Sequence, residues 1–288
     1  MEALTGNKPK KTDIRMIALD LDGTLLTSDK ELTERSRAAL EAAAEKGILI
    51  VPATGRFYAG MPKAVRDLSI IRYAVTINGA LVLDIKTRRE VCSATVPTEE
   101  ALEFYSYLDT LPVIYDCYVD EWGYMTAWMH EAAGEYISNI HSLKMVKELR
   151  TPVPELKAWL KEGGHCPQKM QLFTKNDPVY RDELLGILSE KFPQFAVSTS
   201  LPNNIEINIK GADKGLALAK LAEHCGMAPS QIMAFGDGLN DITMLKTAGI
   251  GVAMENAHPL VKEAADLTTD SCDRNGVAAV IEELLKNS

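Results

Sequence analysis

The stretch DLDGT, residues 20–24, decides the fold of this chain, because it directly follows the apolar run MIAL at residues 16–19. An apolar run that ends abruptly at an acid predicts a buried strand with a carboxylate at its carboxyl end. The same layout recurs in ILIVPATGR at residues 48–56 and in IMAFGDGLND at residues 232–241. In open parallel α/β sheets, ligands bind in the crevice at the carboxyl ends of the strands. These segments therefore predict a single crevice around which the chain is organised.

Length and composition are those of a globular protein, since 288 residues are long for one domain and sufficient for two. A net charge of −9, with no basic stripe beyond residues 1–12, argues against a nucleic-acid partner. The five cysteines are widely spaced and form no CxxC pair, which favours reduced thiols in a cytoplasmic protein over disulfides or zinc. No apolar run approaches the ~18 residues of a membrane span. Residues 1–12 are typical of a disordered lead-in.

The order of the expected elements indicates an α/β fold with a doubly wound, Rossmann-like parallel sheet and an inserted α+β cap domain. We expect the core to comprise residues 13–83 and 210–288, and the cap to comprise residues 84–209. Core helices are expected at residues 32–46, 58–68, 215–224, 241–247 and 276–285, with a third core strand at residues 73–77. In the cap, strands are expected at residues 113–119, 124–128, 169–174, 195–200 and 205–209, and helices at 98–108, 132–143 and 180–191.

Four acids, Asp20, Asp22, Asp237 and Asp241, converge if the strands that precede them are neighbours. Two unit charges about 4 Å apart repel by ~4 kcal/mol at an effective dielectric near ~20, so such a cluster needs a cation. All-oxygen ligands with positions left for water suit Mg²⁺ better than zinc, which prefers His and Cys.

Groups that can bind an anion accompany these acids. Thr54 and Gly55 offer a hydroxyl and backbone N–H groups, and Lys214 supplies a movable positive charge. A hard cation, a carboxylate nucleophile, backbone donors and one lysine are the components that phosphoryl transfer requires.

Two other binding motifs fit the same residues less well. Residues 20–31 place acids at the first, third and last positions of a calcium loop, but Leu25 occupies the position that needs glycine. Gly236 and Gly238 imitate a dinucleotide fingerprint, but Asp241 replaces the third glycine, and its carboxylate would repel a pyrophosphate.

Together, DxDGT, TGR, a helix headed by Lys214-Gly215 and GDGxND resemble the haloacid dehalogenase-like (HAD) phosphohydrolases. The Cof-type subgroup, often called sugar phosphatases and carrying a C2-type cap, is more similar still, and the resemblance extends from Ile14 to Leu285. One departure is Glu255, where many members have glycine. The resemblance implies Mg²⁺-dependent hydrolysis of small phosphomonoesters, such as sugar phosphates or phosphorylated cofactors.

The same resemblance implies a role for each motif residue. Asp20 would attack phosphorus and become an aspartyl phosphate, Asp22 would exchange protons with the leaving alkoxide and the attacking water, and Lys214 would neutralise charge. The implied phosphate-binding positions are Leu21, Thr54, Gly55, Lys214 and Asn240, and the implied metal ligands are Asp20, the Asp22 carbonyl, Asp237 and Asp241.

Residues for substrate specificity are less defined. Arg56 either contacts the phosphoryl group or forms a structural salt bridge, while Asn208 and Lys210 are candidates at the expected cap–core junction. The aromatic side chains and the histidine within residues 122–130 either line a ring pocket or belong to the cap core. A phosphomannomutase-like phosphomutase and a non-catalytic phospholigand-binding protein stay open as alternatives. The sequence names neither the substrate nor the oligomeric state.

Overall fold

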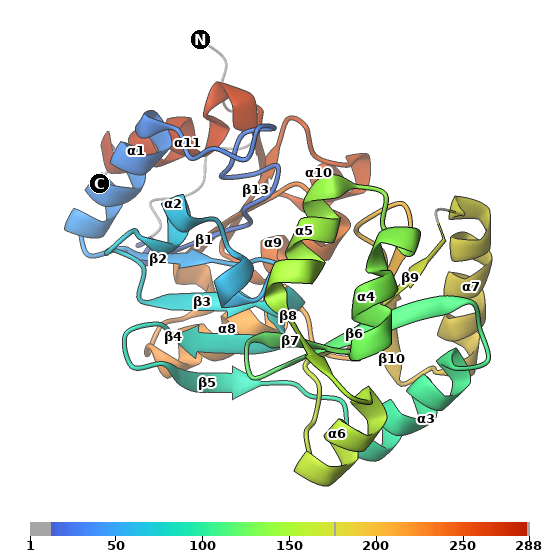
Figure 1. The fold of residues 1–288 in the computed structure, drawn as a ribbon. Coiled ribbons are helices and arrows are strands. Elements are labelled where there is room, and N and C mark those ends of the chain that lie inside the picture. The colour runs from blue at the N-terminus through green and yellow to red at the C-terminus, as the bar shows by residue number, and fades with distance from the viewer. Residues whose placement is uncertain (1–12, 176, 287–288) are drawn as a thin grey trace. The chain divides into compact units, whose positions relative to one another are not determined.

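The structure is a computed structural model that describes residues 13–175 and 177–286 (Figure 1). The chain forms two compact units: the first ends at Ser93 and resumes at Asp213, and the second spans Ala94–Ala212. The expected lead-in at residues 1–12 lies outside the described residues. The expected cap, residues 84–209, starts ten residues before the start of the second unit and ends three residues before the end of that unit.

A five-stranded parallel sheet forms the centre of the first unit, in the order β14-β13-β12-β1-β2. Its strands are β1 (Met16–Leu19), β2 (Leu49–Pro52), β12 (Ile232–Gly236), β13 (Ile250–Met254) and β14 (Leu267–Thr269). All four side chains of β1 are fully buried although they alternate between the two faces of the sheet. The sheet is therefore covered on both faces, as in a doubly wound α/β fold, which confirms the predicted fold class.

A three-stranded sheet continues this unit beyond β2. It consists of β3 (Tyr73–Thr76), β4 (Leu81–Asp84) and β5 (Arg89–Ser93), paired antiparallel. Parallel bridges from Ile50 to Ile71 and from Ala53 to Val75 align β3 with β2. Residues 84–93 belong to the first unit because β4 and β5 extend the pairing of β3, and this explains the difference from the expected cap boundary.

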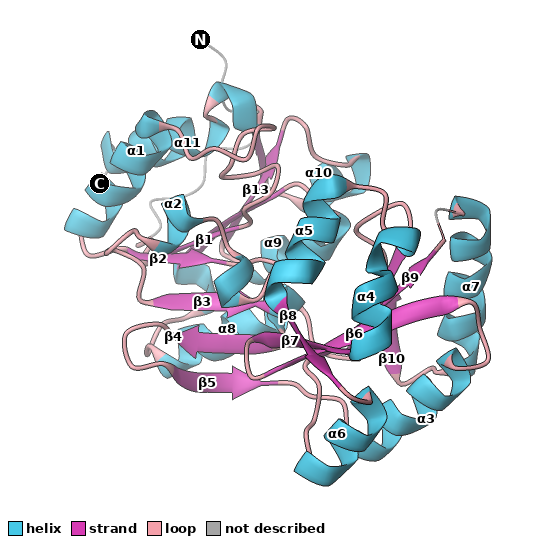
Figure 2. Ribbon diagram, in the orientation of Figure 1, coloured by secondary structure: helices cyan, strands magenta, loops and turns pink. Residues whose placement is uncertain are grey.

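The helices of the first unit differ from the expected ones at two places, the segment 58–68 and the helix Pro259–Ala264, which was not predicted. They are α1 (Glu34–Glu45), α2 (Lys63–Arg66), α8 (Lys214–His224), α9 (Ile242–Thr247), α10 (Pro259–Ala264) and α11 (Gly276–Lys286). The prediction of one helix over residues 58–68 is wrong, because a 3₁₀ turn at Tyr58–Gly60 is separated from α2 by Pro62, which precedes the first helical residue. Figure 2 shows α1 and α11 side by side, and α8 packs against α9.

The second unit is a six-stranded sheet in the order β10-β11-β9-β6-β7-β8, antiparallel except for the β7–β8 pair. Its strands are β6 (Val113–Val119), β7 (Trp122–Thr126), β8 (Arg150–Val153), β9 (Lys169–Thr174), β10 (Phe195–Ser198) and β11 (Asn204–Ile209). Its helices are α3 (Thr98–Leu108), α4 (Ala127–Tyr136), α5 (Ile140–Leu149), α6 (Leu156–Gly163) and α7 (Pro178–Lys191). The prediction of one helix over residues 132–143 is wrong, because the chain leaves the helical conformation at Ile137 and Asn139 caps a new helix by accepting from the Ser142 N–H.

The second unit contains a buried network of charged side chains. Arg150 Nε donates to Asp116 Oδ2 over 2.7 Å, and the two side chains are 3% and 0% exposed. Arg150 also donates to the Tyr118 hydroxyl over 2.7 Å. On the same sheet face, the buried Lys169 ammonium pairs with Glu206 at 2.6 Å. The network lies opposite the apolar face that packs against α3.

Two expectations from composition can be compared with the structure. All five cysteines lie within the described residues and are free thiols. Among residues 13–175 and 177–286, no helix combines the length and the apolar character that crossing a bilayer needs.

Candidate active site

Three acids meet at the carboxyl ends of β1 and β12 because these strands are paired. Leu19 and Phe235 are register partners, and the Asp20 N–H donates to the Phe235 carbonyl over 3.0 Å. A short 3₁₀ turn at Leu239–Asp241 then returns the chain to the same place. One carboxylate oxygen of each of Asp20, Asp237 and Asp241 lies within 4.8 Å of the other two. The structure thus brings these three expected residues into one cluster.

Lys214 joins this cluster from the first position of α8. Its Nζ lies 2.6 Å from both Asp20 Oδ1 and Asp241 Oδ1, and its side chain is fully buried. The helix can bring the lysine this close because Gly215 packs against α9, where an added Cβ would lie 2.4 Å from the Thr243 carbonyl oxygen. A larger residue at this position would push the start of the helix away from the acids.

Burial and mutual repulsion shift the protonation equilibria of the cluster. Burial raises the pKa of Asp20 to about 8, because Lys214 offsets only part of the desolvation and Asp241 adds repulsion. Burial also raises the pKa of Asp237 to about 6. For Lys214, burial alone would lower the pKa, but Asp20 and Asp241 outweigh it and raise the pKa above its ordinary value. One lysine therefore compensates only part of the charge of three carboxylates.

The donor set of this cluster fits a hard divalent cation. Asp237 Oδ1 accepts from Thr24 Oγ1 over 2.7 Å, while Asp237 Oδ2 lies against Gly23. Asp241 Oδ2 accepts the N–H groups of Asp237 and Gly238 at 3.0 and 2.9 Å, so its Oδ1 faces Lys214. Oxygen donors and excess negative charge are the conditions that Mg²⁺ prefers. The residues present thus fit the ion that the sequence indicates.

The Asp22 carboxylate pairs with Arg56 and Lys30 and not with Lys214. The carboxylate accepts two hydrogen bonds from Arg56, Nε to Oδ2 at 2.7 Å and Nη2 to Oδ1 at 2.9 Å, and it also pairs with Lys30 at 3.1 Å. Arg56 Nη1 donates to the Gly60 carbonyl, which fixes the guanidinium plane. Burial would raise the pKa of Asp22, but Arg56 and Lys30 outweigh it and lower the pKa. Of the two alternatives for Arg56, the salt bridge is the one present in the structure.

The expected phosphate-binding residues lie beside the cluster on neighbouring loops. Leu21 directly follows Asp20, and Thr54 and Gly55 follow β2. Thr54 Oγ1 accepts from the Arg56 N–H, so its hydroxyl hydrogen is available to an acceptor. The Asn240 Nδ2 group donates to Asn78 Oδ1 over 3.1 Å.

Asn78 was not among the residues expected from the sequence to form the site. An added Cβ on Gly55 would lie 2.7 Å from Asn78 Oδ1, so this side chain connects the loop after β2 to the loop after β12. The Asn78 backbone is left-handed (φ 57°), a conformation that asparagine adopts more readily than most residues. The sequence alone did not indicate that Asn78 belongs to the site.

The expected specificity residues Asn208 and Lys210 lie in the second unit. The Asn208 side chain is buried and donates to the Gln168 carbonyl over 2.8 Å, whereas Lys210 is exposed. The candidate ring pocket at residues 122–130 is divided between elements: Tyr124 of β7 stacks on Trp159 with ring centroids 4.1 Å apart, and Trp128 of α4 is 55% exposed. These aromatic side chains do not converge on one pocket.

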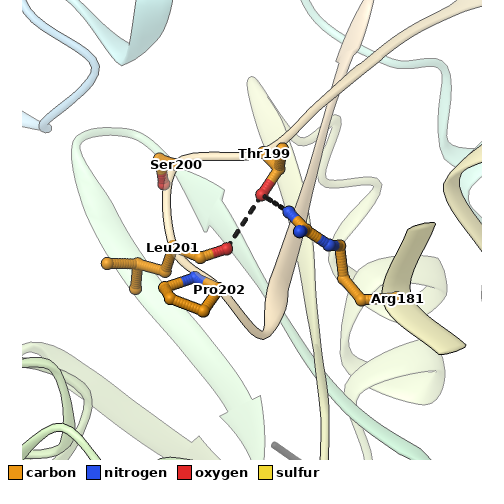
Figure 3. Close-up of a pocket in the computed structure, with 5 residues that line it drawn as sticks. All are labelled: Arg181, Thr199, Ser200, Leu201 and Pro202. Atoms are coloured by element: carbon orange, nitrogen blue, oxygen red, sulfur yellow. Dashed lines mark hydrogen bonds between the residues drawn. The ribbon is translucent and has the colours of Figure 1, made fainter. Parts of the chain in front are cut away.

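A shallow pocket of about 380 Å³ lies elsewhere in the second unit (Figure 3). Arg181 of α7 points toward the turn at residues 199–202 and donates to Thr199 Oγ1 over 2.6 Å. None of the expected site residues lines this pocket.

Comparisons with known proteins agree with this architecture. A family profile described as haloacid dehalogenase-like hydrolase matches residues 17–281. The chain is 32% identical over 272 residues to a 5-amino-6-(5-phospho-D-ribitylamino)uracil phosphatase, YcsE, of Bacillus subtilis, covering 93% of this chain and 95% of that protein. It is 30% identical to the pyridoxal phosphate phosphatase YbhA of Escherichia coli, covering 89% and 95% of the two chains.

Solved structures show the same relationship. TM0651 of Thermotoga maritima superposes with a TM-score of 0.77 at 31% identity, covering 94% of this chain and 97% of that one. A haloacid dehalogenase-like hydrolase of Bacteroides thetaiotaomicron superposes with a TM-score of 0.80 at 27% identity, covering 94% and 99%. The expectation of a phosphoric monoester hydrolase is confirmed at the level of the family. The chain belongs to the haloacid dehalogenase-like hydrolases, in their Cof-type subgroup.

Proposed function

We propose that this protein is a Mg²⁺-dependent phosphatase that hydrolyses small phosphomonoesters in the cytoplasm through an aspartyl phosphate on Asp20. The observation that carries the proposal is the contact of Asp20 Oδ1 with Lys214 Nζ at 2.6 Å, inside a cluster that also holds Asp237 and Asp241. A buried lysine on one oxygen leaves the other oxygen of the same carboxylate as the nucleophile.

The reaction then proceeds in two displacements at phosphorus. The second oxygen of Asp20 forms a bond to phosphorus while the bond from phosphorus to the alkoxide breaks, and the alkoxide takes a proton. Water next attacks phosphorus and gives up a proton, the bond to Asp20 breaks, and inorganic phosphate leaves. Lys214 balances charge in both steps because it remains paired with Asp20 and Asp241. Mg²⁺, when bound by the three acids, supplies the further positive charge that lets a phosphate dianion approach them.

Asp22 is the proton-transfer group in this proposal, and its pairing with Arg56 matters for that role. The ion pair favours the ionised carboxylate, which suits removal of a proton from water in the second displacement. Donation of a proton to the alkoxide requires the neutral carboxyl, so Asp22 has to leave Arg56 in the first displacement.

The relatives support a small substrate. One is named for a phosphorylated ribitylaminouracil and another for pyridoxal phosphate, both of which are phosphomonoesters of small molecules. We therefore propose sugar phosphates and phosphorylated cofactors as the substrate class.

The proposal is tested by p-nitrophenyl phosphate hydrolysis in Mg²⁺ and in EDTA, followed by a panel of phosphorylated metabolites. We expect activity that EDTA abolishes and that Asp20→Asn loses, whereas Asp67→Asn, an exposed acid of the same unit, retains it. Borohydride reduction during turnover should convert the acyl phosphate to homoserine at position 20. Activity that persists in EDTA would refute the metal dependence, a turnover-competent Asp20→Asn would refute the nucleophile, and an isomerised sugar as product would favour the mutase.

A further inference from the structure

Asn256 lies just after β13 and bridges two segments that approach the metal-ligating acids. Its Nδ2 group donates to the Gly23 carbonyl over 2.8 Å, and its Oδ1 accepts the Cys272 N–H over 3.0 Å. Both ends of the amide are therefore used in hydrogen bonds, although the residue is exposed to solvent. Asn256 therefore links the turn after β1 to the segment at Cys272.

The Gly23–Thr24 turn, which Asn256 holds, contacts both oxygens of Asp237. Thr24 Oγ1 donates to Asp237 Oδ1 over 2.7 Å, and Gly23 packs against the other oxygen. The contact on Gly23 is close, since an added Cβ would lie 2.5 Å from Asp237 Oδ2. Gly23 also has a φ of +94°, a conformation that favours glycine. The position of this turn consequently sets the position of the Asp237 carboxylate.

Two of the backbone hydrogen bonds in the turn are long, while the Leu26 N–H donates to the Leu21 carbonyl over 2.9 Å and closes the loop. The Thr24 N–H reaches the Leu21 carbonyl at 3.4 Å, and the Leu25 N–H reaches the Asp20 carbonyl at 3.3 Å. Both distances exceed the usual range for an N–H···O bond, whereas the bond from Asn256 is of normal length. The segment that carries Asn256 also holds Asp237 directly, because the His258 N–H donates to the Asp237 carbonyl over 3.1 Å.

We propose that Asn256 is a positioning residue for the metal site: it holds the Gly23–Thr24 turn against Asp237, so that the Asp237 carboxylate faces the cation. This inference rests on the proposed function in one respect, namely that Asp20, Asp237 and Asp241 bind Mg²⁺. Hydrogen-bonding partners that orient metal ligands typically change metal affinity by about 10–100-fold when they are removed.

The chain offers a matched control. Asp273 lies on the same segment as Cys272 and accepts the Ser28 N–H over 2.8 Å, so it ties the same two parts of the chain together without contacting Gly23, Thr24 or Asp237. Asp273→Ala therefore removes a comparable bond, and any general loosening of the loop should appear in this variant as well.

The experiment measures the dissociation constant of Mg²⁺ alone, without substrate, from the dependence of the unfolding temperature on Mg²⁺ concentration. We expect Asn256→Ala to weaken Mg²⁺ binding about tenfold and Asp273→Ala to leave it within about twofold. Thr24→Val removes the hydroxyl that holds Asp237, and combining it with Asn256→Ala should weaken binding by much less than the product of the two single effects.

Three other results of these Mg²⁺-binding measurements would each overturn a different part of the reasoning. If the unmodified protein binds Mg²⁺ and Asn256→Ala binds it equally well, the inference is overturned while the proposed function stands. Independent effects of Thr24→Val and Asn256→Ala would overturn the route through the turn. Failure of the unmodified protein to bind Mg²⁺ would overturn the inference together with the proposed function.

Discussion

Replacement of Lys214 by methionine tests the electrostatics of the cluster most directly. Methionine has a similar length without the charge, so Lys214→Met leaves Asp20, Asp237 and Asp241 together, with oxygens within 4.8 Å of one another. Two ionised carboxylates at 4.8 Å repel by about 3.5 kcal/mol at an effective dielectric near 20. Removing one partner of a buried ion pair typically costs about 3–5 kcal/mol. We therefore expect a loss of about 3–5 kcal/mol in the free energy of unfolding of the metal-free protein at neutral pH.

This loss should depend on pH and on metal. At about 2–4 °C per kcal/mol for a unit of this size, it corresponds to a fall in Tm of about 6–20 °C. The fall should be smaller at acidic pH, where the raised pKa of Asp237 keeps that carboxyl neutral, and larger above neutral pH, where Asp20, with its pKa raised to about 8, also ionises. Excess Mg²⁺ should restore part of the stability, because the cation replaces the missing positive charge.

The assay is thermal unfolding followed by circular dichroism, with Lys220→Met, an exposed lysine on the same helix, as control. In parallel, kcat of the Lys214→Met variant in saturating Mg²⁺ should fall by at least ~10²-fold, as for other groups that stabilise charge in a transition state. The reasoning would be refuted if Lys214→Met unfolded at the same temperature as the unmodified protein in EDTA at neutral pH.

Three further predictions follow from contacts described above. Arg150→Leu leaves the buried Asp116 carboxylate without the guanidinium it is paired with, so it should destabilise the second unit by about 3–5 kcal/mol in denaturant unfolding. Adding Asp116→Leu should recover much of this loss. Equal stability of Arg150→Leu and the unmodified protein would contradict the prediction. Burial raises the pKa of Asp237 from 3.8 to about 6, so the metal-free protein should lose stability as the pH rises between these two values. Over the same pH range, the increase in Tm caused by Mg²⁺ should become larger. A Tm increase that does not depend on pH would contradict this prediction. Arg56→Met removes the larger of the two influences that lower the pKa of Asp22 and leaves Lys30 in place. The acidic limb of the kcat profile should therefore move to higher pH, and an unmoved limb would exclude Asp22 as the base.

The sequence predicted the core sheet because its strands carry strong signals. The run at residues 16–19 is apolar at every position, which is the pattern of a strand buried on both faces. Helices were less predictable where a local interruption competes with an apolar pattern, as at Pro62 and at Asn139. The elements β14, α10 and α6 were missed: they have three, six and eight residues and, unlike α9, do not directly follow a recognised motif.

The cluster of acids could be anticipated for a related reason. The carboxyl ends of adjacent parallel strands lie at one edge of a sheet, so strand identity alone brings Asp20 close to Asp237. The bonds of Thr24 and Asn256 could not be anticipated in the same way. They end on a side chain and a carbonyl whose positions depend on how the turn after β1 folds over the loop after β13.

The DLDGT motif determines where Asp22 lies in the chain but not whether its carboxyl group is ionised. The motif places this carboxylate two residues from Asp20, but its preferred protonation state depends on Arg56, which is 34 residues further along the chain. With Arg56 bound to both oxygens, the ionised form is favoured, and the proton-donating form becomes accessible only when this pair opens. The guanidinium is held by the Gly60 carbonyl, whereas the second partner of the carboxylate, Lys30, has a largely exposed side chain that can follow it, so the carboxylate is the partner that can move. In the proposed mechanism, Asp22 therefore rotates away from Arg56 when it gives a proton to the alkoxide, and its return favours removal of a proton from water.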